Sequence, residues 1–294
     1  MQTKGYNLDL GFTPIKVVDG FSWNTRINLS HFKTIINKVS DSADEVNLYN
    51  DTTFGIFAVK GEEFPLIKGI GYDRDSQGRI IINQATGNPT YTSEFKNLGQ
   101  VTPDYILGFT NSFKYKGLTL VAVGDYRTGH KFFSEVREQL AWTGNLIESA
   151  ENGRSGGFIM PNTVYESTPG SGIYVPNTNV VTGGNTYRTY QDYFGNDHAF
   201  NNAENNVLDA TAFKLREVAL SYSIPSKVFQ NTGISSFTIG VNAKNLLMVL
   251  PKNTNNKYYN DPEASNTTGN AQGVANIGAY PFVRSYGFML NLTF

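Results

Sequence analysis

The last stretch of the chain, FVRSYGFMLNLTF at residues 282–294, alternates between two kinds of side chain. One set consists mainly of large apolar groups, Phe282, Arg284, Tyr286, Phe288, Leu290, Leu292 and Phe294. The other set is smaller and more polar, Val283, Ser285, Gly287, Met289, Asn291 and Thr293. Because successive side chains of a β-strand point to opposite faces, the stretch predicts a strand with one apolar face and one polar face.

The same alternation recurs in six further segments. Their more apolar sets are Tyr6, Leu8, Leu10 and Phe12; Phe21, Trp23, Ile27 and Leu29; Leu107, Phe109, Phe113 and Tyr115; Leu118, Leu120, Ala122, Gly124 and Tyr126; Val218, Leu220, Tyr222 and Ile224; and Phe237, Ile239, Val241 and Ala243. Residues 53–60 alternate poorly and are either a loop strand or part of an extra pair. We expect about seven or eight antiparallel strands, each about as long as the 9–11 residues that cross a bilayer when tilted.

The polar set of side chains separates a membrane barrel from a water-soluble β-sandwich. Solvent-facing strands tend to carry Lys and Glu, whereas these faces carry mainly Asn, Ser, Thr and Gly, as a crowded barrel lumen does. Aromatic residues near the strand ends suit interfacial girdles, namely Tyr6, Phe12, Phe21, Trp23, Tyr115, Tyr126, Phe282 and Phe294. The pattern favours an all-β, transmembrane antiparallel β-barrel, with a soluble sandwich as the alternative.

The connections between the expected strands sort by length. If the terminal strand descends to the periplasm, the short connections at residues 14–20, 116–117 and 225–233 all fall on the periplasmic side. The long connections near residues 34–104, 129–210 and 248–281 then all fall outside the cell. Outer-membrane barrels show this asymmetry of short periplasmic turns and long extracellular loops. The sorting therefore supports the barrel and predicts three long extracellular loops.

The composition excludes several classes of function. The 24 basic and 25 acidic residues give a formal net charge of -1, without the basic surplus that nucleic-acid binding requires. The chain has no cysteine, so disulfides and thiolate chemistry are excluded. A mean hydropathy of -0.32 does not discriminate between classes, because a transmembrane barrel alternates apolar and polar residues and so resembles a soluble protein on average.

Several separate motifs resemble one family in the same order. They are TKGYNLDLGFTPIK (3–16), YDRDSQGRIIIN (72–83), LGQVTPDYILGFTNSFKYKGLTLVAVGDYRTG (98–129), FKLREVALSYSIPSKVF (213–229), VNAKNLL (241–247), YNDPEAS (259–265) and RSYGFMLNLTF (284–294). Together they resemble the carboxyl-terminal part of SusC/RagA-type TonB-linked outer-membrane proteins. The resemblance spans almost the whole chain.

The resemblance implies a larger protein and a transport function. Proteins of this family have about 22 strands around a plug, so we expect residues 1–294 to be the carboxyl-terminal barrel segment, with the plug and amino-terminal domains absent. The family implies import of a large polar nutrient, a glycan or peptide, across the outer membrane. A SusD-like surface lipoprotein would cover the barrel, and TonB would energise it through the missing amino-terminal part. A non-transporting scaffold in a surface assembly and a soluble carbohydrate-binding sandwich are the alternatives.

Tyrosines in the expected outer loops are the candidate contacts to the substrate or to the lid protein. Their flat faces can stack on sugar rings while the hydroxyl groups form hydrogen bonds. Ordinary loop packing is the alternative for each of them. The candidates are Tyr165, Tyr174, Tyr187, Tyr190, Tyr193, Tyr258 and Tyr259, together with Phe194.

The segment with Asp73, Asp75, Gln77 and Gly78 imitates the start of a calcium-binding loop, which carries oxygen ligands at alternate positions and a glycine at the sixth. The twelfth position is Gln84, where an EF-hand has a bidentate glutamate. We expect either a calcium site here or a plain polar turn. No other cofactor is expected.

The sequence carries no recognisable catalytic motif. The three histidines, His31, His130 and His198, are far apart, and none lies in a zinc-protease motif. The stretch GRSGG (153–157) lacks the strand and helix that flank a nucleophilic serine. We therefore expect that the protein is not an enzyme.

Overall fold

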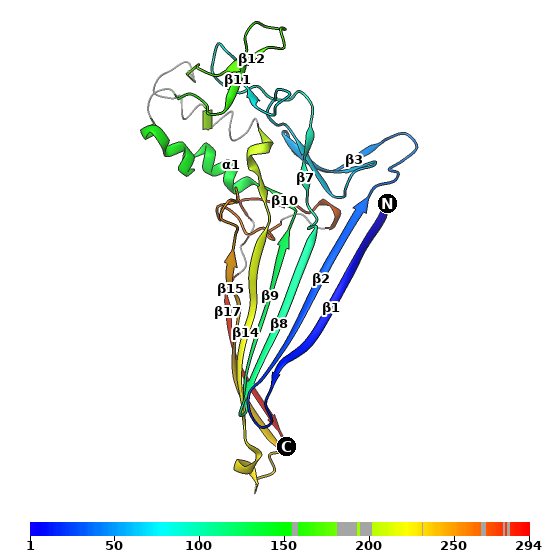
Figure 1. Cartoon of the computed structure of the whole chain (residues 1–294), viewed down its shortest axis with the longest axis vertical. Helices are drawn as coiled ribbons and strands as arrows, with labels where there is room; N and C mark the ends of the chain where they lie inside the picture. The colour runs from blue at the N-terminus through cyan, green and yellow to red at the C-terminus, as the bar shows by residue number, and fades with distance from the viewer. Residues whose placement is uncertain are drawn as a thin grey trace.

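The largest element is one antiparallel sheet of seven strands, in the order β1-β2-β8-β9-β14-β15-β17 (Figure 1). The computed structural model describes residues 1–154, 158–180, 193–194, 202–230, 232–265, 269–278, 280 and 283–294. The strands of the sheet are β1 (Gln2–Lys16), β2 (Ser22–Ile35), β8 (Tyr105–Tyr115), β9 (Leu118–Thr128), β14 (Ala212–Ile224), β15 (Ser236–Val249) and β17 (Ser285–Thr293). They coincide with the seven alternating segments of the sequence.

Three hairpin connections lie at one end of this sheet. The shortest is Lys116-Gly117, where both residues have positive φ angles of 44° and 87°. Two consecutive positive φ angles match the twist of paired strands, and glycine adopts such an angle without steric cost. The connection between β14 and β15 contains the short 3₁₀ helix η4 (Ser226–Phe229). The carboxyl terminus lies near the same end (Figure 1).

The three long connections gather at the opposite end of the sheet, where they form what we call the crown: residues 36–104, 129–211 and 250–284 (Figure 1). The crown contains the sheets β3-β4-β5-β7, β13-β10-β16 and β12-β11-β6. Their strands are β3 (Glu45–Asn50), β4 (Phe54–Val59), β5 (Leu66–Gly69), β6 (Ile80–Ile81), β7 (Lys96–Gln100), β10 (Lys131–Ser134), β11 (Thr163–Glu166), β12 (Tyr174–Pro176), β13 (Val207–Asp209) and β16 (Val274–Ala275). Its helices are α1 (Glu135–Trp142) and the 3₁₀ turns η1 (Ile147–Arg154), η3 (Ala203–Asn206) and η5 (Gly269–Ala271). The poorly alternating residues 53–60 thus contribute the crown strand β4 and no strand of the long sheet.

The hydrophobic core lies in the crown. Phe54 stacks on Phe133 with ring centroids 3.7 Å apart. Around this pair pack Ile56, Ile67, Leu98, Val207 and Val274, which come from all three long connections. The core therefore joins the three connections into one body. Across the described residues, no helix has the length and apolar character needed to cross a membrane.

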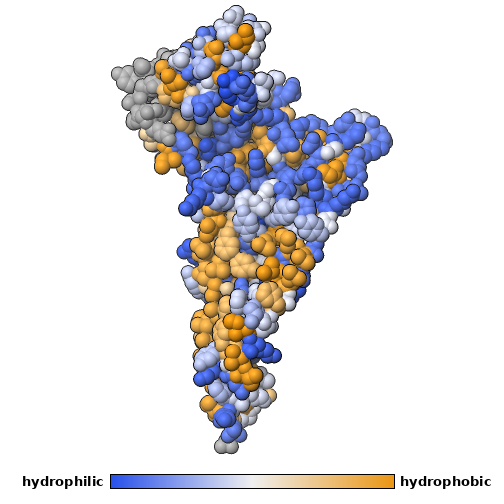
Figure 2. Space-filling view, in the orientation of Figure 1, coloured by the Kyte–Doolittle hydropathy of each residue, from blue (hydrophilic) through white to orange (hydrophobic). Residues whose placement is uncertain are grey.

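One face of the long sheet is apolar from edge to edge. The register aligns Leu8 with Leu29, Leu29 with Leu107, and Leu107 with Tyr126. On the other half of the sheet, Leu118, Tyr222, Ile239 and Leu290 are aligned in the same way. Figure 2 shows hydrophobic side chains gathered over the long sheet, below a mostly hydrophilic crown.

Many side chains of this apolar face are exposed, including Leu8 at 49% and Leu290 at 61%. Soluble monomers rarely expose so large a contiguous apolar surface. A barrel wall carries such a surface on the outside, where lipid covers it.

The opposite face carries polar side chains that bond across the strands. Arg26 donates from Nη2 to Asp9 Oδ2 at 2.6 Å, and Ser30 donates to Asn7 Oδ1 at 2.9 Å. Such cross-strand pairs stabilise a sheet and satisfy polar groups on a crowded surface. The predicted division into one apolar and one polar face is confirmed. Among the described residues β1 and β17 do not pair, so the sheet is an open wall.

Candidate functional site

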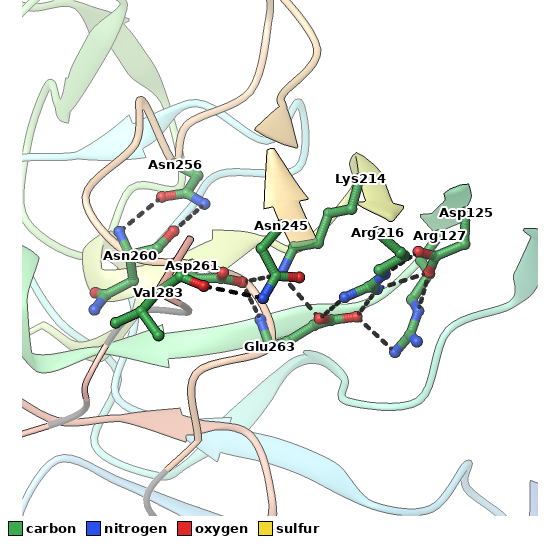
Figure 3. A network of polar contacts seen from close by, with 10 residues as sticks. All are labelled: Asp125, Arg127, Lys214, Arg216, Asn245, Asn256, Asn260, Asp261, Glu263 and Val283. Carbon is green, nitrogen blue, oxygen red and sulfur yellow. Dashed lines mark hydrogen bonds and ion pairs between the residues drawn. The ribbon is translucent and has the colours of Figure 1, made fainter. Parts of the chain in front are cut away.

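Six charged side chains form a network where the crown meets the polar face of the sheet (Figure 3). Asp125 and Arg127 come from β9, Lys214 and Arg216 from β14, and Asp261 and Glu263 from the crown. The three cations and three anions balance, so the network is neutral. We call these six residues the ion-pair network.

Arg216 is the centre of the ion-pair network. The pairing of β14 with both neighbouring strands is irregular between Leu215 and Glu217. Against β9, these two residues pair with the adjacent Val123 and Gly124, so Arg216 is the extra residue of a β-bulge, whereas against β15 the extra residue lies on β15. The Nη2 of Arg216 lies 2.8 Å from Asp125 Oδ2, and its Nη1 lies 2.7 Å from Glu263 Oε2. The bulge therefore lets one guanidinium bridge the sheet and the crown.

Lys214 and Arg127 complete the network around Glu263. Lys214 forms an ion pair with Asp261, and its Nζ lies 2.9 Å from Glu263 Oε2. Arg127 Nη1 lies 2.9 Å from Glu263 Oε1. Burial opposes ionisation of Glu263, but the hydrogen bonds from Arg216 and Lys214 outweigh it and lower the pKa of the carboxyl to about 2. The positive and negative side chains of the ion-pair network pair with one another. The network therefore joins the crown to the sheet and offers no free charge to a ligand.

His130 lies against the same network and is only 7% exposed. Burial, followed by the positive charge of Arg127, lowers the pKa of its imidazole to about 4. Within the described residues its Nδ1 has no hydrogen-bond partner. The imidazole is therefore buried in its neutral form.

Residues 256–260, just before Asp261, form a tight turn that contains two of the predicted tyrosines, Tyr258 and Tyr259. The buried Asn256 donates from Nδ2 to the carbonyl of Asn260 at 3.0 Å and accepts from the Asn260 amide at 3.3 Å. Between them, Lys257 and Tyr258 have positive φ angles of 45° and 64°. Such angles are uncommon for residues other than glycine and occur where the surroundings over-determine the backbone. The strained turn leaves Tyr258 60% exposed.

Tyr258 and Tyr259 line a cavity of about 410 Å³. Tyr259 is half-buried: its hydroxyl donates to Glu148 Oε2 at 3.3 Å, and its ring lies 5.8 Å from the guanidinium of Arg137. The Tyr258 hydroxyl accepts from the Leu250 amide at 3.4 Å. The other lining residues are Val136, Lys214, Asn245, Leu246, Leu247, Met248, Asn260, Asp261, Ala264 and Arg284. An apolar wall with a few polar groups and aromatic rings is the usual composition of a small-ligand site.

The remaining predicted tyrosines are in different places. Tyr165, in β11, lines a second, shallower depression of about 490 Å³, and Tyr174 begins the neighbouring strand β12. Tyr193 is 4% exposed and packs with Phe194, Ala141 and Leu146, so its role in this structure is packing. Tyr187 and Tyr190 lie outside the described residues. Of the predicted tyrosines that the structure describes, Tyr258 and Tyr259 are thus the two that it brings together at one cavity.

The predicted calcium turn is closed by its own side chains. Asp75 accepts hydrogen bonds from the amides of Gln77 at 3.0 Å and Arg79 at 2.8 Å, and from Arg79 Nε at 2.8 Å. Burial raises the pKa of Asp75, but these three hydrogen bonds and the charge of Arg79 outweigh it and lower the pKa of the carboxyl. In the described part of the chain, no three acidic or histidine side chains group around a position for a metal ion. Calcium binding by Asp73, Asp75 and Gln77 stays a prediction.

Sequence reasoning did not single out the remaining polar groups of the cavity. Arg284 belongs to the alternating terminal segment, and Lys214 and Asp261 lie within the motifs FKLRE and YNDPEAS. Their charges were visible in the sequence, but no spacing along the chain indicates that residues 214, 261 and 284 meet. The one available signal was the presence of two acidic residues, Asp261 and Glu263, in one short loop, which could have indicated an ion-pair contact between this loop and the sheet.

An antiparallel sheet with one apolar and one polar face, open at both edges and crowned by long connections at one end, has the architecture of part of a β-barrel. Comparison with known proteins places it more narrowly. No family model matches the chain. Two curated proteins of Formosa agariphila are similar over its whole length, TonB-dependent receptor P26 at 24% identity and TonB-dependent receptor P3 at 22% identity. The chain spans 29% of the length of each.

Solved structures agree with the sequence relatives. The RagAB peptide importer in its closed-closed state matches 99% of this chain with a TM-score of 0.62 and 18% identity, and the match covers 29% of that chain. The open-open state matches 99% of this chain with a TM-score of 0.60, again at 18% identity, over 28% of that chain. The resemblance to SusC/RagA-type TonB-dependent receptors is confirmed. The fold class, a segment of a larger antiparallel barrel, is confirmed with it.

Proposed function

We propose that this chain is the barrel segment of an outer-membrane importer that takes up a large polar nutrient, a glycan or peptide, in a TonB-dependent manner. In this proposal the crown lies outside the cell and contacts a SusD-like lipoprotein or the substrate. TonB acts through a part of the protein that this chain does not include. No reaction is catalysed, which agrees with relatives that are named as receptors and importers.

The observation that carries the proposal is the continuous apolar face of the seven-stranded sheet. Every strand of the sheet contributes apolar side chains to this face, in the aligned rows from Leu8 to Tyr126 and from Leu118 to Leu290. A lipid bilayer covers such a face without a protein partner. The polar face then lines a lumen through which a polar nutrient passes.

The cavity beside Tyr258 supplies a place for substrate contact in this proposal. It lies at the crown end of β15, which contributes the lining residues Asn245, Leu246, Leu247 and Met248. The ion-pair network holds the cavity-lining residues Lys214 and Asp261 at the sheet. We therefore assign substrate contact to Tyr258 and Tyr259 and a fastening role to Glu263.

The proposal is tested by uptake in cells. A strain lacking the full-length receptor gene, and the same strain carrying the gene, are compared for accumulation of a fluorescent oligosaccharide library and a fluorescent peptide library. Accumulation that depends on the receptor and disappears when TonB is deleted supports the proposal. Equal accumulation with and without TonB contradicts TonB-dependent import. Absence of accumulation, with surface proteins that co-purify with the barrel, favours the scaffold.

A further inference from the structure

We propose that the cavity beside Tyr258 binds its ligand through a carboxylate group, which the guanidinium of Arg284 recognises. The inference rests on the proposed function, because it assigns a ligand chemistry to the cavity of the same importer. It starts from the charges of the lining residues.

Among the lining residues that the structure describes, three carry a charge: Lys214, Asp261 and Arg284. Lys214 and Asp261 pair with each other and belong to the neutral ion-pair network. Arg284 is exposed, and none of the ion pairs formed among the described residues involves it. Within this described lining, the pairing of Lys214 with Asp261 leaves one positive charge, that of Arg284.

A planar guanidinium with several donors fits the two oxygens of a carboxylate better than a point charge does. Asn245 fixes the chain next to Arg284, because its Nδ2 donates to the carbonyl of Val283 at 3.2 Å (Figure 3). Asn245 itself has a positive φ angle of 54° in an irregular part of β15. The base of the Arg284 side chain is thus held against β15, at the rim of the cavity.

The surroundings suit the rest of such a ligand. The pairing of β15 with β17 ends at Lys244 and Ser285, while β15 continues to Val249 and still pairs with β14. Within the described residues, the last residues of β15 therefore have a strand on one side only. Their backbone groups, the Tyr258 ring and the apolar Leu246 and Met248 can bind a polar chain beside its carboxylate.

The carboxylate has two sources among the proposed nutrients, an acidic sugar or a peptide. The test uses purified full-length receptor in detergent and two matched pairs of probes. The first pair is an oligogalacturonate and its neutral methyl ester. The second pair is an unblocked peptide and the same peptide with a carboxyl-terminal amide. Dissociation constants are measured by calorimetry for the wild type, Arg284→Gln, Arg284→Lys, and the control Lys227→Gln at the opposite end of the sheet.

We expect at least one acidic probe to bind about ten- to a hundred-fold more tightly than its neutral partner, as a hydrogen bond to a charged group gives. Arg284→Gln should remove this difference, Arg284→Lys should retain part of it, and Lys227→Gln should leave it unchanged. The pair that shows the difference identifies the source of the carboxylate.

Equal binding of both members of each pair overturns the inference, and so does a preference that survives in Arg284→Gln. Failure of the wild type to bind any probe also overturns it. The import proposal fails separately: a ligand bound through Arg284 in detergent but never accumulated by cells would leave the carboxylate site standing and remove the transport function.

Discussion

The substitution Glu263→Gln tests whether the ion-pair network fastens the crown to the sheet. The amide keeps the size of the side chain but removes its charge, so three cations remain with two acids. Arg216 at 2.7 Å, Lys214 at 2.9 Å and Arg127 at 2.9 Å all lose an anionic partner. Removing one member of a buried ion pair costs about 3–5 kcal/mol, because the partner is left buried without compensation.

The pKa of Glu263 gives a second value for this cost. Lowering the pKa from 4.5 to about 2 corresponds to about 3 kcal/mol of stability, and solvent screening of the partly exposed network reduces this to about 2 kcal/mol. If the loss is confined to opening of residues 256–265, their amides should exchange about 30-fold faster, since about 1.4 kcal/mol is a factor of ten.

Hydrogen exchange of the full-length receptor in detergent, followed by mass spectrometry, measures this effect. Residues 256–265 should exchange faster in Glu263→Gln, while residues 236–244 of β15 should keep their rates. The exposed Glu94→Gln serves as the matched control. Unchanged exchange at residues 256–265, or equal acceleration along β15, would refute the fastening role.

Three further outcomes are expected. Leu290→Arg, on the apolar face, should cost about 2–4 kcal/mol of barrel stability if the residue lies near the bilayer midplane. Asn291→Arg, on the polar face, should cost little. A urea titration in lipid vesicles measures both variants, and equal losses of stability would contradict the assignment of faces. Tyr259→Ala should lower the free energy of unfolding by about 1–2 kcal/mol, because the Tyr259 ring is half-buried. Tyr258 is exposed, so Tyr258→Ala should change this free energy by no more than about 0.5 kcal/mol. Thermal unfolding measures both variants, and a larger loss for Tyr258→Ala would be inconsistent with the structure. The pKa of His130 is about 4 in the folded protein and 6.5 ordinarily, so its contribution to stability is complete above pH 6.5 and is lost as the pH falls toward 4. The urea midpoint of the wild type should therefore decline more steeply over this range than that of His130→Gln, and parallel declines would disprove burial of a neutral imidazole.

The strands of the long sheet were predictable because each one carries its own two-residue period. In the segment from Phe237 to Ala243 the alternation alone assigns Ile239 and Val241 to the apolar face, and the register of β15 with β14 and β17 agrees. The bulge at Arg216 was not predicted. The apolar positions change phase there, from Phe213 and Leu215 to Val218 and Leu220, as an inserted residue requires, but only the partner strands show where the pairing shifts between Leu215 and Glu217.

The crown shows the limit of sequence reasoning more clearly. Tyr193 and Tyr258 looked alike as loop tyrosines, yet one is buried in a core and the other is mostly exposed. Nothing in the flanking residues distinguishes them, because burial in the crown depends on which distant segments fold over each residue. The stacking of Phe54 on Phe133, 79 positions later in the numbering, is a contact of the same kind.

The sequence by itself determined the seven strands, their two faces and the end of the sheet at which the long connections gather, because these follow from a period of two residues and from the order of short and long connections. Only the tertiary structure decided that Arg216 bridges Asp125 and Glu263, that Tyr258 and Arg284 border one cavity, and that Tyr193 is packed away. The physical reason is that strand faces are set by neighbours along the chain. Charge pairing and cavities are set by residues that are distant along the chain, such as Arg216 with Glu263, 47 positions apart, and with Asp125, 91 positions apart, and only the folded packing brings those residues together.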